Sequence, residues 1–286
     1  MLPVDPAATA PTLAHASSAN WQRGALGLLL TPFVVGIAAA VLPRIHLGDP
    51  SASIVVYAGA ASTSLAALAI AAGSYPPWKW RLATTAVATI ALAAAFWEAA
   101  RGMAAPVAVS ASLVAAAWAI GTSIGRRIEH PGHLLPACVV VACADATSIV
   151  SQFGPTHAIA ENEAALSIVT VGFPVPGTSS FAPALGVGDL IFVAIVFGAV
   201  AAHRLSLARA ALLCGLGTAV AGAASAVLET AVPALVPIAA AIIVGVPEAR
   251  RLRPRERRAA TFAMVIAVSV AAAAIASQLR GYLMGM

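Results

Sequence analysis

The sequence predicts an all-α fold, a polytopic bundle of membrane-spanning helices, from two observations. Hydrophobic residues make up 60% of the 286 residues and charged residues only 9%, with a mean hydropathy of +0.92, so the chain has too little polar surface to coat a soluble core. The apolar residues also form continuous runs of about 20 residues, the length that crosses a hydrocarbon layer as a helix. A transmembrane β-barrel would instead show alternating segments of about 10 residues.

The apolar runs predict about nine transmembrane helices, preceded by a tail. Residues 1–23 are rich in Ala, Pro, Ser and Thr and lack the basic start of a signal peptide, so we expect a disordered cytoplasmic tail. Trp78, Trp80 and Trp97 lie at the ends of runs, as side chains of an interfacial aromatic belt do. The predicted spans are residues 24–43, 52–73, 80–100, 104–125, 134–151, 183–202, 206–228, 233–247 and 261–279.

Three parts follow the tail in this prediction. Residues 24–125 form an N-terminal membrane half of four helices. Residues 134–247 hold four further helices and carry the motifs described below. Residues 248–286 comprise an arginine-rich loop and an extra C-terminal membrane helix.

The distribution of Lys and Arg predicts the orientation of the chain. Across nine spans, thirteen of the sixteen Lys and Arg residues fall on one side, and only Arg44, Arg101 and Arg280 fall on the other. Short loops rich in Lys and Arg stay in the cytoplasm, so we expect a multi-pass protein of a cytoplasmic membrane whose N-terminus is cytoplasmic. Membrane orientation thus explains the net charge of +5, and we expect the lipid bilayer but no nucleic acid as a partner.

Two carboxylates lie well inside apolar runs, whereas the other nine acidic residues lie in loops, tails or span ends. A charged side chain near the middle of a span costs at least ~2.5 kcal/mol and is usually retained for function. Asp145 lies six residues before the end of the fifth run and Asp189 six residues after the start of the sixth, so both lie roughly 9 Å inside the same membrane boundary. Equal depth on neighbouring helices predicts that the two side chains can meet.

Glycines precede the second of these aspartates in Leu-Gly-Val-Gly-Asp-Leu. Gly186 and Gly188 place no side chain beside Asp189, so a neighbouring helix or an unwound substrate backbone can approach closely. The alternative is that these glycines serve only helix packing.

A proline-containing element opens the short eighth run, where Pro233, Ala234 and Leu235 follow one another. Proline breaks helical pairing, which a bilayer tolerates only where the backbone is buried in protein or lines a cavity. The alternative is an ordinary helix start with proline in its first turn.

The loop between the two aspartate spans contains a second candidate element. Residues 166–173 are rich in β-branched side chains and end at a Pro-Val-Pro-Gly turn, so they predict a short strand. We expect this strand either to offer an edge to an extended substrate segment or to be a plain surface hairpin.

Metal and cofactor chemistry is not expected from the remaining residues. His130 and His133 lack the third and fourth ligands that zinc needs. The three cysteines lie inside spans, where we interpret them as small packing residues.

An intramembrane aspartate, a Gly-x-Gly-Asp motif one span later and a Pro-Ala-Leu motif two spans beyond it resemble the presenilin and signal peptide peptidase family of intramembrane aspartyl proteases, in its bacterial or archaeal form. The resemblance covers about residues 134–247 and implies a presenilin-like catalytic core that hydrolyses transmembrane protein or peptide substrates with one water and no cofactor. It implies that Asp145 and Asp189 are the catalytic pair. The residues that would shape the site and receive substrate are Gly186, Gly188, Pro233, Ala234 and Leu235.

Two other functions remain open at this point. The same buried aspartates would suit a transporter coupled to protons or cations, although the first four spans contain no duplicate of either motif, as an inverted repeat would. A family member that has lost catalysis and only binds membrane helices is the other alternative. Oligomeric state is not encoded in any of these features.

Overall fold

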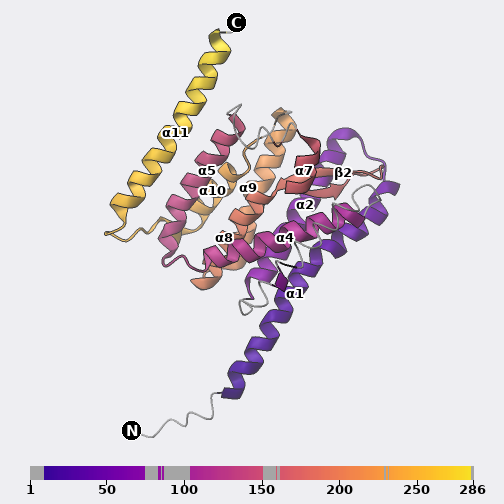
Figure 1. Cartoon of the computed structure of the whole chain (residues 1–286), viewed down its shortest axis with the longest axis horizontal. Helices are drawn as coiled ribbons and strands as arrows, with labels where there is room; N and C mark the ends of the chain where they lie inside the picture. Colours follow the sequence, from indigo (N-terminus) through magenta and orange to yellow (C-terminus); the bar gives the residue numbers. More distant parts are fainter. Residues whose placement is uncertain are drawn as a thin grey trace.

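The computed structural model describes residues 10–74, 83–84, 86, 104–150, 159, 162–228, 230 and 232–284. The chain is mostly helical, with one small hairpin (Figure 1). The α-helices are α1 (Ala10–Val41), α2 (Asp49–Ala72), α4 (Ala104–Gly125), α5 (Leu134–Val150), α7 (Glu163–Val169), α8 (Val187–Ala202), α9 (Leu207–Leu228), α10 (Leu235–Gly245) and α11 (Arg257–Met284). The strands are β1 (Thr170–Pro174) and β2 (Phe181–Gly186), and the 3-10 turns are η2 (Leu42–Arg44), η3 (Pro131–His133) and η4 (Pro247–Arg250).

Six of these helices are long and apolar enough to cross a membrane, and α8 and α10 are shorter apolar helices. The predicted helical membrane bundle is therefore confirmed at this level. The third predicted span, residues 80–100, lies almost entirely outside the described residues. Helix α1 begins at Ala10, inside the segment that we expected to be a disordered tail, and residues 1–9 of that tail are not described.

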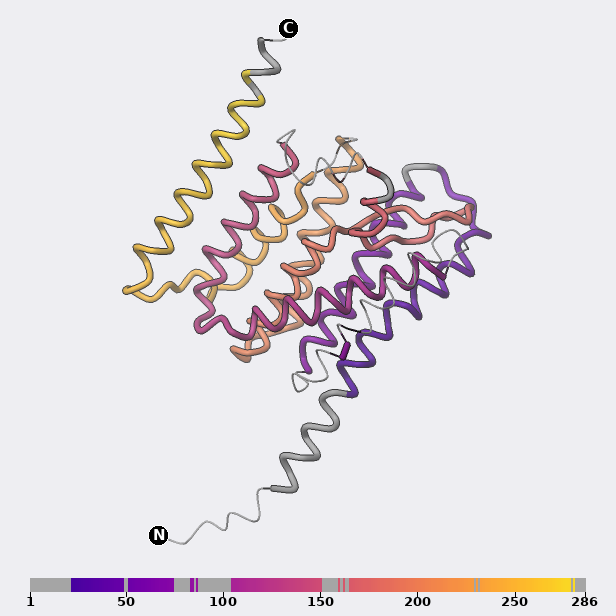
Figure 2. Tube along the Cα trace, viewed as in Figure 1, coloured from indigo at the N-terminus to yellow at the C-terminus, as the bar shows by residue number. Residues whose placement is uncertain are grey.

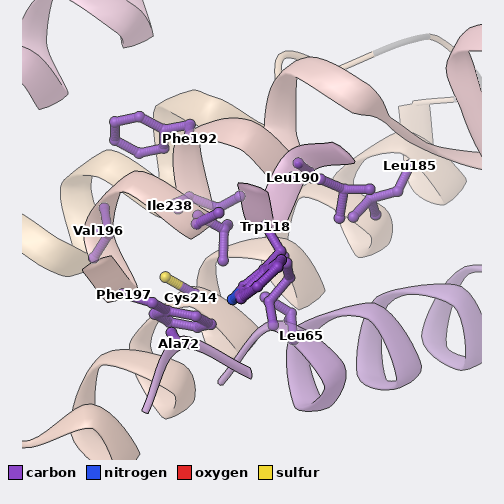
Figure 3. Packing of buried hydrophobic residues seen from close by; sticks show 14 of the residues in the cluster. Leu65, Ala72, Trp118, Leu185, Leu190, Phe192, Val196, Phe197, Cys214 and Ile238 are labelled. Carbon is purple, nitrogen blue, oxygen red and sulfur yellow. The ribbon is translucent and has the colours of Figure 1, made fainter. Parts of the chain in front are cut away.

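The helices form a row in which each packs against the next: α11, α5, α10, α9, α2 and α1. Helices α4 and α8 pack along each other and against α2 of this row (Figure 1). Trp118 of α4 is buried at the centre of the apolar core, among residues such as Leu65 and Phe197 (Figure 3). Helix α5 is the second member of this row, next to α11, whereas α4 and α8 pack on α2 in its other half.

Small residues allow the close approach of α4 and α8. A methyl group at Gly125 would overlap the Ile195 carbonyl oxygen, and one at Gly121 would overlap the backbone of Ile191. Gly198 of α8 lies in the same way against the backbone of Thr122. This is the packing that small residues spaced four apart give to membrane helices, where lipid supplies no hydrophobic drive for association.

The hairpin lies between α7 and α8. Its strands pair antiparallel, with Val171 opposite Leu185 and Gly172 opposite Pro183, so Ala184 is an extra residue on β2. Ser110 of α4 donates to the Gly172 carbonyl at 3.1 Å and accepts from the Gly172 amide at 3.2 Å. Helix α4 therefore occupies the outer edge of β1.

The tip of the hairpin is held as well. Gly177 adopts a left-handed backbone, with φ of 75°, a conformation that costs glycine nothing. Its amide donates to the Leu42 carbonyl at 2.9 Å, which ties the tip to the connection between α1 and α2.

Two predicted boundaries in this region are wrong. The strand expected over residues 166–173 starts only at Thr170, because Asn162 caps a short helix through Ala165 N at 3.1 Å and residues 166–169 complete it. The sixth predicted span does not begin at Pro183 but at Val187, because residues 181–186 pair with β1. Pro183 suits a strand edge, since it has no N–H to donate.

Gly125→Ala should destabilise the protein by about 1–3 kcal/mol, because the added methyl forces α4 away from α8. Unfolding of the detergent-solubilised protein by heat or denaturant measures this. Gly36→Ala is the matched control, since no atom of the described residues lies within 4 Å of the added methyl and alanine favours a helix by about 0.5–1 kcal/mol. Equal stability of the two variants would contradict the packing described here.

Candidate functional site

Asp145 lies on α5 and reaches the start of α10. Its Oδ2 accepts a hydrogen bond from the Leu235 amide at 3.0 Å. Leu235 is the first residue of α10, and Ala234 before it is the N-cap, without a side-chain cap of its own. The first amides of a helix have no partner within the helix, so the carboxylate of Asp145 supplies one. Two motifs separated by 90 positions thus meet at a single hydrogen bond.

Asp189 lies in the first turn of α8, immediately after β2. The Gly186 amide donates to its Oδ2 at 3.3 Å, in the geometry of a capping box. Gly186 is extended, with φ of −70° and ψ of 146°, so the chain turns there from strand into helix. A carboxylate in the first turn is also stabilised by the helix dipole.

The two glycines of the motif have different surroundings. A methyl group at Gly186 would lie 3.3 Å from Asp189 Oδ2, whereas one at Gly188 would meet nothing within 4 Å. Gly188 is exposed, one residue before Asp189. No atom of the described residues outside its own chain neighbourhood crowds Gly188, so the helix-packing alternative has no contact in its support there.

Asp145 and Asp189 lie within electrostatic range of each other, and no hydrogen bond among the described residues joins them directly. Both are partly buried. They come from helices with different packing partners, since α5 packs against α10 and α11 whereas α8 packs against α4, α2 and α9. The two carboxylates are therefore carried by helices that pack separately, and a shift of α5 would change their separation.

Tyr57 of α2 is a polar residue of this region that the sequence analysis did not identify. It lies within electrostatic range of Asp189, and its ring packs on Gly222 of α9, where any Cβ atom would overlap it. The sequence signal that could have identified Tyr57 is the presence of a tyrosine inside an apolar run. Nothing in its spacing indicated that α2 would place it beside a residue 132 positions away.

His130 and His133 each contact another group of the protein. His133 Nε2 lies 2.8 Å from Glu256 Oε2, and His130 Nδ1 accepts from the Gly132 amide at 3.0 Å. Within the described ranges, no three His, Cys, Asp or Glu side chains come together as metal ligands would. Among the described residues, the polar groups at this site are the two carboxylates, the Gly186 and Leu235 amides and the Tyr57 phenol.

Fold and site together define a helical integral membrane protein with a pair of partly buried carboxylates, each held by the amide at the start of a short helix. Comparison of the chain with protein-family models, curated proteins and solved structures finds no match.

Asp145→Leu should lower the thermal stability by about 1–3 kcal/mol, because the Leu235 amide is left without an acceptor. Asp145→Asn keeps an oxygen at the same place and should unfold close to wild type. Thermal unfolding of both variants in the same detergent compares them. Identical midpoints would mean that this hydrogen bond does not hold α5 to α10.

Proposed function

We propose that the protein is an intramembrane aspartyl protease of the presenilin and signal peptide peptidase type, which hydrolyses peptide bonds within transmembrane segments. The observation that carries this proposal is that Asp145, which accepts from the Leu235 amide, lies within electrostatic range of Asp189. In this proposal the chain crosses the membrane nine times, with residues 80–100 as the third span and the N-terminus in the cytoplasm. The substrates are transmembrane proteins or peptides.

The chemistry follows from two carboxylates in one low-dielectric site. Both cannot ionise comfortably at short range, so the pair shares one proton. The ionised member takes a proton from a water whose oxygen bonds to the scissile carbonyl carbon, while the protonated member gives its proton to the carbonyl oxygen. The resulting diol returns one proton to a carboxylate as the C–N bond breaks, and the other carboxyl protonates the leaving amine. A carboxylic acid and an amine leave, and the pair regains its single proton.

The two backbone hydrogen bonds suit these roles. Each engages Oδ2 of its aspartate, and no hydrogen bond among the described residues engages either Oδ1. One oxygen of each carboxyl thus fixes the orientation of the group, while the other is available to a water or a substrate carbonyl. Preorganisation of this kind lowers the reorganisation needed at the moment of reaction.

The hairpin offers a place for an unwound substrate. A transmembrane helix hides its amides in internal hydrogen bonds, so it has to open locally before water can attack. The edge of β1 is occupied by Ser110, whereas no hydrogen bond of the described residues joins the outer edge of β2 to another element. Strand β2 leads within three residues from Gly186 to Asp189. A substrate strand added to β2 would therefore lie beside the carboxylates.

Asp145→Asn and Asp189→Asn should each lower cleavage of a single-span model substrate by at least about a hundredfold, because neither variant can share the proton. Purified protein in lipid nanodiscs and mass spectrometry of the products measure this. Glu129→Gln, an exposed carboxylate on another loop, is the matched control and should cleave like wild type. Cleavage that persists in either aspartate variant would contradict the assignment of Asp145 and Asp189 as the catalytic pair.

The same preparations separate the alternative functions. A transporter coupled to protons would acidify or alkalinise liposomes in an aspartate-dependent way and cleave nothing. An inactive member would bind the substrate helix without either activity. Both outcomes would replace the protease proposal.

Phe181→Pro should reduce substrate cleavage about tenfold or more, while Phe181→Val should have a small effect. Val175 donates to the Ser180 carbonyl at 3.0 Å, so alternation along the antiparallel ladder turns the Phe181 N–H away from β1. Proline removes that outward donor and valine keeps it. Circular dichroism and thermal unfolding verify that both variants fold. Equal cleavage by the two would show that β2 does not bind the substrate backbone.

A further inference from the structure

A strongly cationic surface lies at the opposite end of α5 from the aspartates. We call residues 247–258, which connect α10 to α11, the arginine loop. It contains six arginines, all exposed: Arg250, Arg251, Arg253, Arg255, Arg257 and Arg258. In the described part of the chain its ion pairs all involve Glu256, with His133 at 2.8 Å and Arg253 at 3.8 Å. Most of these guanidinium groups therefore have no carboxylate partner within the described structure.

The arginine loop is folded and is attached to the start of α5. It begins with η4, whose Ala249 is fully buried. Gly132 of η3 lies so close to the Arg251 carbonyl that a Cβ atom would overlap it. The arginines are therefore displayed from a surface of defined shape and not from a free tail.

The position of the arginine loop matches the headgroup layer of a membrane. Helices α5 and α11 both begin beside it (Figure 2). Directly after the last arginine, α11 exposes large apolar side chains, including Phe262 and Val265, which are 69% and 56% exposed. Such a change from apolar to cationic along one helix marks the boundary between acyl chains and phosphate headgroups.

Helix α11 connects this surface to α5 along its length. Its less exposed positions recur every three or four residues, as expected for one packed stripe, at Ala260, Met264, Ala267, Ala271 and Ala274. Helix α5 is the main packing partner of α11. His133 immediately precedes α5 and Glu256 immediately precedes α11, so their 2.8 Å contact joins the segments that lead into the two helices. Anything that fixes the arginine loop therefore also fixes α5.

We infer that the arginine loop is a docking surface for the phosphate headgroups of anionic phospholipids, and that their binding stabilises the position of α5. Guanidinium groups pair with phosphate oxygens in a bidentate geometry, and anionic lipids are concentrated by juxtamembrane clusters of basic residues. Because α5 carries Asp145, lipid binding at the loop would support the alignment of the two carboxylates. This second effect rests on the proposed function, whereas the lipid binding does not.

The test compares full-length protein in nanodiscs of phosphatidylcholine alone with nanodiscs that also contain phosphatidylglycerol. Native mass spectrometry counts retained phosphatidylglycerol molecules, and thermal unfolding measures the stabilisation. The loop variant combines Arg250→Gln, Arg251→Gln, Arg255→Gln and Arg258→Gln. The control variant has the same net charge but changes four exposed arginines on other cytoplasmic segments: Arg23→Gln, Arg127→Gln, Arg204→Gln and Arg209→Gln.

Wild type and the control variant should retain phosphatidylglycerol and unfold at a higher temperature when it is present, whereas the loop variant should lose at least about tenfold in lipid affinity. Glu256→Gln keeps every arginine, so it should retain the lipid but show a smaller stabilisation. The inference is overturned if the loop variant retains as much phosphatidylglycerol as wild type, or if the control variant loses as much lipid affinity as the loop variant. It is also overturned if the loop binds an oligonucleotide while phosphatidylglycerol has no effect. Absence of cleavage in every lipid would refute the protease proposal while leaving the lipid result to be judged separately.

Discussion

The constraint on which this structure depends is that a hydrocarbon layer offers no partner to a free backbone amide. Helices α8 and α10 have 16 and 11 residues, so they are about 24 and 17 Å long, shorter than a layer of about 30 Å. In a membrane, such helices begin or end inside the apolar region. The amides of Gly186 and Leu235 are satisfied by Asp189 and Asp145. The carboxylates therefore accept hydrogen bonds from backbone amides at the starts of α8 and α10. This structural role explains how two acidic side chains are tolerated within an apolar part of the protein.

Much of this arrangement could be predicted from the sequence because the bilayer imposes simple rules. Apolar length identified the six helices that are long enough to cross a membrane. Exclusion of charge from the predicted spans isolated Asp145 and Asp189 among eleven acidic residues. The depth argument took Pro183 as the start of the sixth span, but α8 begins at Val187, so Asp189 lies two residues into its helix instead of six. These inferences concern position along one axis, the membrane normal, and hydropathy reports on that axis directly.

The features that were missed depend on how helices pack side by side in the membrane plane, or on whether a short segment forms a helix or a strand. Residues 183–186 contain no charged or strongly polar side chain, so they extend the apolar run of α8 without a break; pairing with β1 is what places them in β2. The helix over residues 163–169 depends on one cap at Asn162. The placement of Tyr57 near Asp189 depends on the packing of α2 against α9 through Gly222. None of these contacts leaves a periodic signal in the chain.

The anchoring of the hairpin fixes the position of β2 relative to Asp189. Its tip is tied to Leu42 and its middle to Ser110, so β2 cannot slide relative to the bundle. The number of residues from β2 to Asp189 is constant, and a peptide laid against this strand would present its backbone to the carboxylates in one register. In a protease of the proposed kind, the cleaved bond would lie at a fixed number of residues from the substrate segment paired with β2. Its position would then depend on that distance along the substrate and not on the identity of the flanking side chains.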